Sequence, residues 1–217
     1  MFDTSLSLAD LLFLAKGAWI TILVTAISVV LGSVLGIVFG TFRYQVGPVF
    51  AAPLTFFLDI FRSIPLLIQL VLANAFAGMV LRLQVSGFTV ACAVLTLYTS
   101  AYCAEIVRGA IDAVPMTTRR AARSLGMTWW QDMRQIVLPL ATRVALPSWI
   151  GLALGVMKDS SLVFIVQVTE LLKSTQILIV RLNEPLFLLL ICGAFYFIIS
   201  FPLARFGGYL ERRWSND

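Results

Sequence analysis

A carboxylate in an otherwise apolar stretch is the residue with the clearest chemical potential in this sequence. Asp159 stands in the run VMKDSSL, inside a segment long and apolar enough to cross a membrane. A charge inside such a segment is costly unless it is paired or hydrated, so it is a candidate for function by default. The carboxylate could accept an ammonium group, or it could form an internal ion pair, for example with Arg62. The neighbouring Ser160 could bond either a ligand or the backbone one turn back.

Two further apolar segments carry polar side chains. Tyr98, Thr99 and Ser100 are consecutive in one segment, while Arg62 and Gln69 lie two turns apart in another. Pro65, between the last two, removes an amide donor and predicts a kinked or broken helix. A structural role for each of these residues is the alternative. The candidates for a polar path are therefore Asp159, Ser160, Tyr98, Thr99, Ser100, Arg62 and Gln69.

Several kinds of chemistry are not predicted. The chain has no histidine, which is the commonest general base and metal ligand. Cys92, Cys103 and Cys192 lie in apolar runs without CxxC spacing, so neither a disulfide nor a metal site is expected. There is no G-x-x-x-x-G-K-[ST] loop to hold ATP, and no carboxylate pair suggests hydrolysis.

The composition is that of a membrane protein. Of 217 residues 60% are hydrophobic and only 12% are charged, and the mean hydropathy is +0.95. An average soluble domain is about a quarter charged. We therefore expect residues 1–217 to form one all-α membrane domain. The net charge of +5 does not indicate nucleic-acid binding, because the arginines cluster between apolar segments instead of forming a groove with aromatic residues.

About 20 apolar residues cross a hydrocarbon core as a helix. By that rule the sequence predicts five transmembrane helices. They cover residues 19–42, 53–81, 87–104, 144–166 and 186–206.

The charge distribution predicts the orientation of these spans. Residues 107–143 hold six arginines against two aspartates, and the C-terminal tail is also basic. Both regions should face the cytoplasm by the positive-inside rule. With five spans the N-terminus lies outside, which Asp3 and Asp10 permit.

Small residues recur every four positions in two of the spans. Gly32, Gly36 and Gly40 share one helix face, and Gly151 and Gly155 repeat the pattern. Such faces let helices approach closely in lipid. Internal packing is the first interpretation, and a contact between subunits is the alternative.

The segment 107–143 is predicted to contain a helical hairpin. Residues 119–125 favour a short helix, and Gly126 supplies a turn that requires positive φ. A capping-box spacing that begins at Thr128 starts a second helix over 129–137, and Pro139 is expected to end it. Arginines stand beside apolar residues in this hairpin, which suits either a protein partner or lipid headgroups.

At the start of the same segment, Glu105 and Arg108 have the i, i+3 spacing of an ion pair. The pair could orient the hairpin, although a purely local contact is the simpler reading.

The run RAARSLGMTWWQDMRQIVLP resembles the cytoplasmic "EAA" loop of binding-protein-dependent ABC importer permeases, with the pattern EAA–x3–G followed by LP. In that family the loop forms a coupling helix seated in a cleft of the ATP-binding subunit. Arg120 stands where the family usually has glutamate. The residues to which the resemblance assigns ATPase coupling are Arg119, Arg120, Ala121, Ala122, Arg123, Leu125, Gly126 and Trp130.

Three other segments, SAYCAEIVRGAIDAVP, FRSIPLLIQ and MKDSSLVFIVQVTEL, resemble the polar amino acid uptake branch of that family. In relatives the motif around Asp159 is near the substrate path, and asparagine is common where Tyr98 stands. The resemblance implies the permease subunit of a type I ABC importer in a bacterial inner membrane, not an enzyme. The substrate would be a polar amino acid or a related small zwitterion.

The resemblance also implies an assembly. The partners would be two cytoplasmic ATP-binding subunits that hold ATP–Mg, a second identical or homologous permease, and an extracytoplasmic solute-binding protein. This chain itself would need no cofactor. A self-sufficient secondary carrier or channel and an integral-membrane enzyme are the alternatives.

Overall fold

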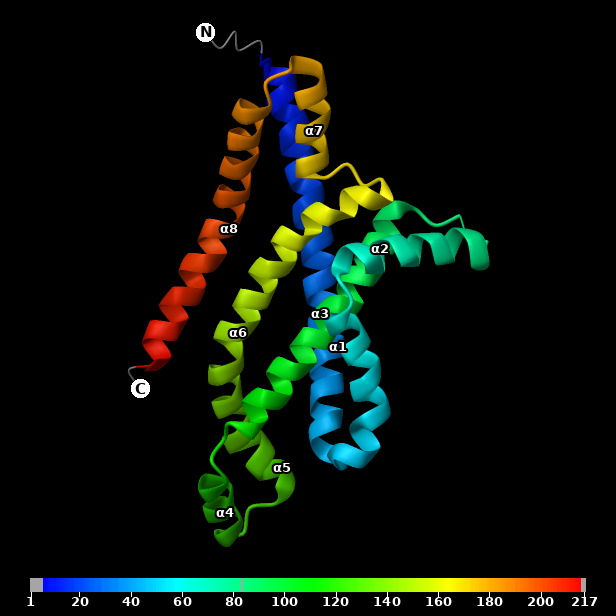
Figure 1. The fold of residues 1–217 in the computed structure, drawn as a ribbon. Coiled ribbons are helices and arrows are strands. Elements are labelled where there is room, and N and C mark those ends of the chain that lie inside the picture. Colours follow the sequence, from blue (N-terminus) through cyan, green and yellow to red (C-terminus); the bar gives the residue numbers. More distant parts are fainter. Residues whose placement is uncertain (1–5, 83, 216–217) are drawn as a thin grey trace.

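The computed structural model describes residues 6–82 and 84–215, and every regular element in these ranges is a helix (Figure 1). Asp3, which bears on the predicted orientation, lies outside the described residues. The elements are α1 (Leu8–Ser63), α2 (Leu66–Ala75), the π-helix η1 (Phe76–Val80), α3 (Gly87–Asp112), α4 (Met116–Ser124), α5 (Trp129–Asp132), the π-helix η2 (Met133–Val137), α6 (Leu138–Asp159), the 3₁₀-helix η3 (Ser160–Val166), α7 (Leu171–Leu182) and α8 (Pro185–Ser215).

Helix α1 consists of two limbs that fold back on each other. Gly47 has φ +76° and ψ 169°, outside the helical region, and the limbs on either side of it run antiparallel (Figure 1). Glycine adopts this conformation without a steric penalty. The first limb contains the predicted span 19–42, and the second contains the start of the predicted span 53–81.

The predicted break near Pro65 is confirmed. The second limb of α1 ends at Ser63 and α2 begins at Leu66, so the helix is interrupted at the proline. The buried Gln69 amide repairs this break, because its Nε2 donates to the carbonyl oxygens of Phe61 at 2.8 Å and Ile64 at 2.7 Å.

The predicted spans do not each correspond to one helix. Within the described residues, four helices are long and apolar enough to cross a membrane, namely Leu8–Ser63, Gly87–Asp112, Trp129–Val166 and Pro185–Arg213. The apolar helix Leu66–Val80 is shorter. The predicted second span is therefore divided between a limb of α1 and the segment α2–η1, and the five-span count stays a prediction.

The glycine face of α1 packs against α3. A Cβ atom built on Gly36 would lie 2.5 Å from Cβ of Cys103, and one on Gly32 would lie 2.6 Å from Cβ of Thr99. Internal packing thus explains this face. The glycines of α6 differ, because no heavy atom lies within 4 Å of a Cβ built on Gly151 or Gly155.

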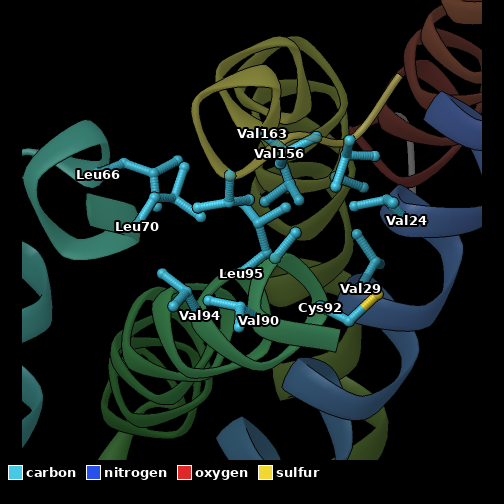
Figure 2. Close-up of a cluster of buried hydrophobic side chains, with 14 residues drawn as sticks. Val24, Val29, Leu66, Leu70, Val90, Cys92, Val94, Leu95, Val156 and Val163 are labelled. Atoms are coloured by element: carbon cyan, nitrogen blue, oxygen red, sulfur yellow. The ribbon is translucent and has the colours of Figure 1, made fainter. Parts of the chain in front are cut away.

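A hydrophobic core joins four parts of the chain near the end of α6. Figure 2 shows Val24 of α1, Leu70 of α2, Leu95 of α3 and Val163 of η3 converging on one cluster. All four side chains are buried. This core fixes the broken segment at α2 against α3 and the C-terminal end of α6.

The predicted hairpin forms, with two differences. Gly126 has φ +81°, and Thr128 with Gln131 makes the predicted capping box at the start of α5. The first helix begins earlier than predicted, at Met116. The expected end at Pro139 is wrong, because η2 leads directly into α6.

The reason for the second difference is the π-turn. Leu138 N–H bonds to the Met133 carbonyl, one residue further back than in an α-helix. This wide turn shifts the hydrogen-bond register just ahead of the proline, and Pro139 then occupies the first turn of α6, where its missing N–H costs little.

Residues 171–182, which lie between two predicted spans, form the helix α7. This helix packs beside the start of α1, where a Cβ on Gly17 would lie 2.5 Å from Oγ of Ser174 (Figure 1).

Candidate functional site

The Asp159 carboxylate, at the C-terminal end of α6, faces the side chain of Tyr98 on α3. Among the described residues no lysine or arginine lies within ion-pairing distance of Asp159. Arg62, proposed above as an internal partner, is engaged elsewhere. Asp159 and Tyr98 are thus the two predicted path residues that the fold brings together.

A second charged group lies further along α3. Oε2 of Glu105 accepts from Nη1 of Arg43 at 3.0 Å and from Nη1 of Arg62 at 3.3 Å, and its Oε1 accepts from Arg108. The predicted pair between Glu105 and Arg108 is confirmed. Because Arg43 and Arg62 belong to the two limbs of α1, this one carboxylate ties both limbs to α3.

Aromatic side chains connect these two sites. Tyr98, Tyr102 and Glu105 follow i, i+4, i+7 spacing and so share one face of α3. The rings of Tyr98 and Tyr102 lie 4.8 Å apart, and the Arg62 guanidinium lies 5.9 Å from the Tyr102 ring centroid. One face of α3 therefore carries a continuous series of polar and aromatic groups from Asp159 to the Glu105 cluster.

Four other predicted path residues are occupied in packing. Thr99 and Ser100 are fully buried, Thr99 against Gly32, and Ser160 is fully buried as well. The hydroxyls of Ser100 and Ser160 each donate to the carbonyl three residues back, at 2.7 Å. Gln69 caps the break at Pro65. None of these four side chains forms a hydrogen bond with Asp159.

In the hairpin, Arg119 turns inward. Its Nε and Nη2 both lie 3.1 Å from Oδ2 of the fully buried Asp132, and its Nη1 donates to the Tyr44 hydroxyl. Only 5% of Arg119 is exposed. Burial opposes the charge of Arg119, but its bonds to Asp132 and Tyr44 outweigh burial and raise its pKa. Arg119 therefore joins the two arms of the hairpin. Ala122 is also buried, so neither residue is on the outward face.

The outward face of the hairpin is formed by the remaining predicted residues. Leu125 is 85% exposed and Trp130 is 74% exposed. The other exposed members of the predicted coupling set are Arg120, Ala121, Arg123 and Gly126.

Glu170, which is fully buried at the start of α7, is not among the predicted site residues. Its carboxylate accepts from the amides of Leu172 and Lys173, each at 2.7 Å, and from the Tyr196 hydroxyl at 3.2 Å. Burial raises the pKa of Glu170 despite these bonds. Glutamate is not among the residue types preferred at helix N-caps, so no local pattern in the sequence pointed to this residue.

Metal chemistry has no apparent site here. Across residues 6–82 and 84–215 no group of three histidine, cysteine, aspartate or glutamate side chains could hold a metal ion. The three cysteines are buried and free.

Long apolar helices with a charged cluster between them and an exposed helical hairpin define a multi-pass membrane protein. Its similarity to a known family identifies the kind of membrane protein. The model of the family described as "Binding-protein-dependent transport system inner membrane component" matches residues 28–216. The chain belongs to this family, whose members are permease subunits of ABC transporters, so it is not an enzyme, and ATP hydrolysis belongs to partner subunits.

Individual relatives resemble it over nearly its whole length. It is 30% identical to the probable amino-acid ABC transporter permease protein YckA of Bacillus subtilis, covering 100% of this chain and 95% of that one. It is 32% identical to the arginine transport system permease protein ArgU of Corynebacterium glutamicum, covering 100% of this chain and 70% of the relative. A crystal structure of an amino acid ABC transporter with histidines matches with a TM-score of 0.85 at 26% identity, over 93% of this chain and 94% of the other.

Proposed function

We propose that this chain is the translocating subunit of an ATP-driven importer for a polar amino acid or a related small zwitterion. The observation that supports the proposal is the Asp159 carboxylate, which faces Tyr98 and forms no ion pair among the described residues. A carboxylate without an ion-pair partner in a membrane helix suits the ammonium group of a solute. The names of the relatives, which include amino-acid and arginine permeases, support the same substrate class.

The topology we propose has five crossings in a bacterial inner membrane, with the N-terminus outside and the C-terminus in the cytoplasm. The bend between the two limbs of α1 lies at the same end of the molecule as α4 and α5 (Figure 1). The chain must return from that end before α3 begins, and the second limb of α1 with α2 makes this return. A broken helix is tolerated at membrane depth where its freed carbonyl groups are hydrogen-bonded. Here the Gln69 side chain donates to two of them.

The assembly we propose contains a second, identical or homologous permease, two cytoplasmic ATP-binding subunits that hold ATP–Mg, and an extracytoplasmic solute-binding protein that delivers the substrate. The outward face of the hairpin at α4 and α5 would meet the ATP-binding subunit. This chain would hold no cofactor of its own.

Asp159→Asn tests whether the charge of this carboxylate is needed for transport. The change keeps the side-chain size and removes the charge, so we expect uptake of the substrate to fall at least tenfold while the complex still assembles. Asp112→Asn, in the exposed pair with Arg108, is the matched control and should keep near-normal uptake. Unchanged uptake kinetics in Asp159→Asn for every amino acid tried would reject the substrate contact.

A further inference from the structure

The outward face of the hairpin carries charge of one sign. In the segment from Met116 to Arg134 the exposed charged residues are Arg120, Arg123 and Arg134, and none is acidic. The one acidic residue, Asp132, is fully buried and neutralises Arg119 inside the hairpin. No hydrogen bond or ion pair engages the side chains of Arg120 and Arg123 within the part of the chain that the structure describes.

Large apolar side chains accompany these arginines. Leu125 is 85% exposed, Trp130 is 74% exposed and Met116 is 59% exposed. An exposed apolar patch beside unpaired arginines is typical of a surface that is covered in the assembled state.

The position of the hairpin favours a protein over lipid as the cover. The helical segment Trp129–Val166 has 38 residues, whereas about 20 residues are enough to cross a hydrocarbon core of about 30 Å. Trp130 then lies about 20 Å further along the helix than Arg143. A tilt of about 40° would still leave about 15 Å. The headgroup layer is only about 5–7 Å thick on each side, so the hairpin extends beyond it.

A hollow lined by arginines lies beside this face. A cavity of about 590 Å³ lies between Tyr44 and Gln45 of α1, Arg120 and Arg123 of α4, and Trp129. Arg119, which is bound to Asp132, also lines it. Two further arginines, Arg120 and Arg123, line the hollow, and guanidinium groups bind carboxylates strongly.

From these observations we infer that the cytoplasmic ATP-binding subunit presents an aspartate or glutamate to Arg120 and Arg123, in an acidic cleft with an apolar floor for Leu125 and Trp130. This inference rests on the proposed function and specifies the chemistry of the partner. It also gives a role to Arg120, which stands where the family usually has glutamate.

Charge reversal in the intact complex tests the inference. The permease is co-expressed with the ATP-binding subunit with which it transports, purified and reconstituted in lipid nanodiscs. Arg120→Glu with Arg123→Glu should reduce capture of the ATP-binding subunit and ATP hydrolysis at least tenfold. The matched control is Arg212→Glu with Arg213→Glu, an equal charge change at the exposed end of α8, and it should keep both.

A cross-link identifies the acidic partner. The native cysteines are all buried, so a cysteine introduced at Arg120 is the accessible one among the described residues. It should cross-link to a cysteine placed next to an acidic residue of the ATP-binding subunit. Changing that acidic residue to lysine should then restore at least half of the activity of the doubly reversed permease.

The outcomes separate the inference from the proposed function. If the unaltered permease supports no ATP-dependent uptake with any ATP-binding subunit, the proposed function fails. If it does, but the doubly reversed variant with an unchanged melting temperature is equally active, only the acidic cleft is refuted. The cleft is also refuted if the variant loses only its affinity for vesicles containing phosphatidylglycerol, because the surface then binds lipid.

Discussion

The guanidinium group of Arg119 lies 3.1 Å from the carboxylate of Asp132, and both side chains are buried between α4 and α5. These residues come from opposite arms of the hairpin, on either side of Gly126. The Tyr44 hydroxyl accepts a bond from the same guanidinium, so the pair also anchors the hairpin to α1. The inward-facing Arg119 thus holds the two arms of the hairpin together, while Arg120 and Arg123 on the same helix remain exposed.

Asp132→Asn should destabilise the hairpin strongly, because it leaves the buried Arg119 charge without its partner. Removing one member of a buried pair typically costs about 3–5 kcal/mol. We expect a lower melting temperature of the purified chain and loss of ATP-dependent uptake. Asp112→Asn breaks an exposed pair and should cost less than about 1 kcal/mol. Equal melting temperatures for the two variants would show that the buried pair is not what closes the hairpin.

Gly36→Val should disturb the contact between α1 and α3. The first added atom would lie 2.5 Å from Cβ of Cys103, closer than side chains approach, and overpacking typically costs about 1–3 kcal/mol. Gly151→Val adds the same side chain at a position where a built Cβ meets no side chain and no neighbouring helix within 4 Å. Thermal unfolding of the detergent-solubilised chain should distinguish them. A Gly36→Val protein as stable as Gly151→Val would mean that the helices adjust at little cost.

Glu170→Ala should weaken the start of α7, because it removes the acceptor for two amides and for Tyr196. Loss of a helix N-cap alone costs about 0.5–2 kcal/mol. The loss should lower the melting temperature at every pH tested.

The pH dependence of this effect has a definite sign. Burial raises the pKa of Glu170, so the fold favours the protonated carboxyl. The stability it contributes is complete below its unfolded pKa of about 4.3 and decreases as the pH rises through the raised folded pKa. The difference in melting temperature between the parent and Glu170→Ala should therefore be larger at pH 4 than at pH 8. A difference that grows toward pH 8 would contradict this assignment.

Local chemistry in the sequence predicted the elements whose causes are local. Gly126, the capping box at Thr128 and the break at Pro65 each follow from one or two residues, and the structure confirms all three. The helix end predicted at Pro139 was wrong. A π-turn, which has no clear sequence signature, changes the hydrogen-bond register before Pro139, so that the missing proline N–H does not end the helix.

Contacts between distant residues were not predictable in the same way. Arg119 matched the coupling motif, yet its burial depends on Asp132 and Tyr44. Gln69 matched a path residue, yet its amide satisfies carbonyls that the break releases. The spacing of Glu105 and Arg108 predicted their pair, whereas Arg43 joins the same carboxylate only because α1 folds back on itself.

The most direct test of the account is uptake of a radiolabelled amino acid into proteoliposomes that contain this chain, its ATP-binding subunit and its solute-binding protein. We expect accumulation above the external concentration, and only when ATP, the binding protein and this chain are all present. Uptake that proceeds equally without ATP, and only down the concentration gradient, would contradict the account and favour a self-sufficient channel or carrier.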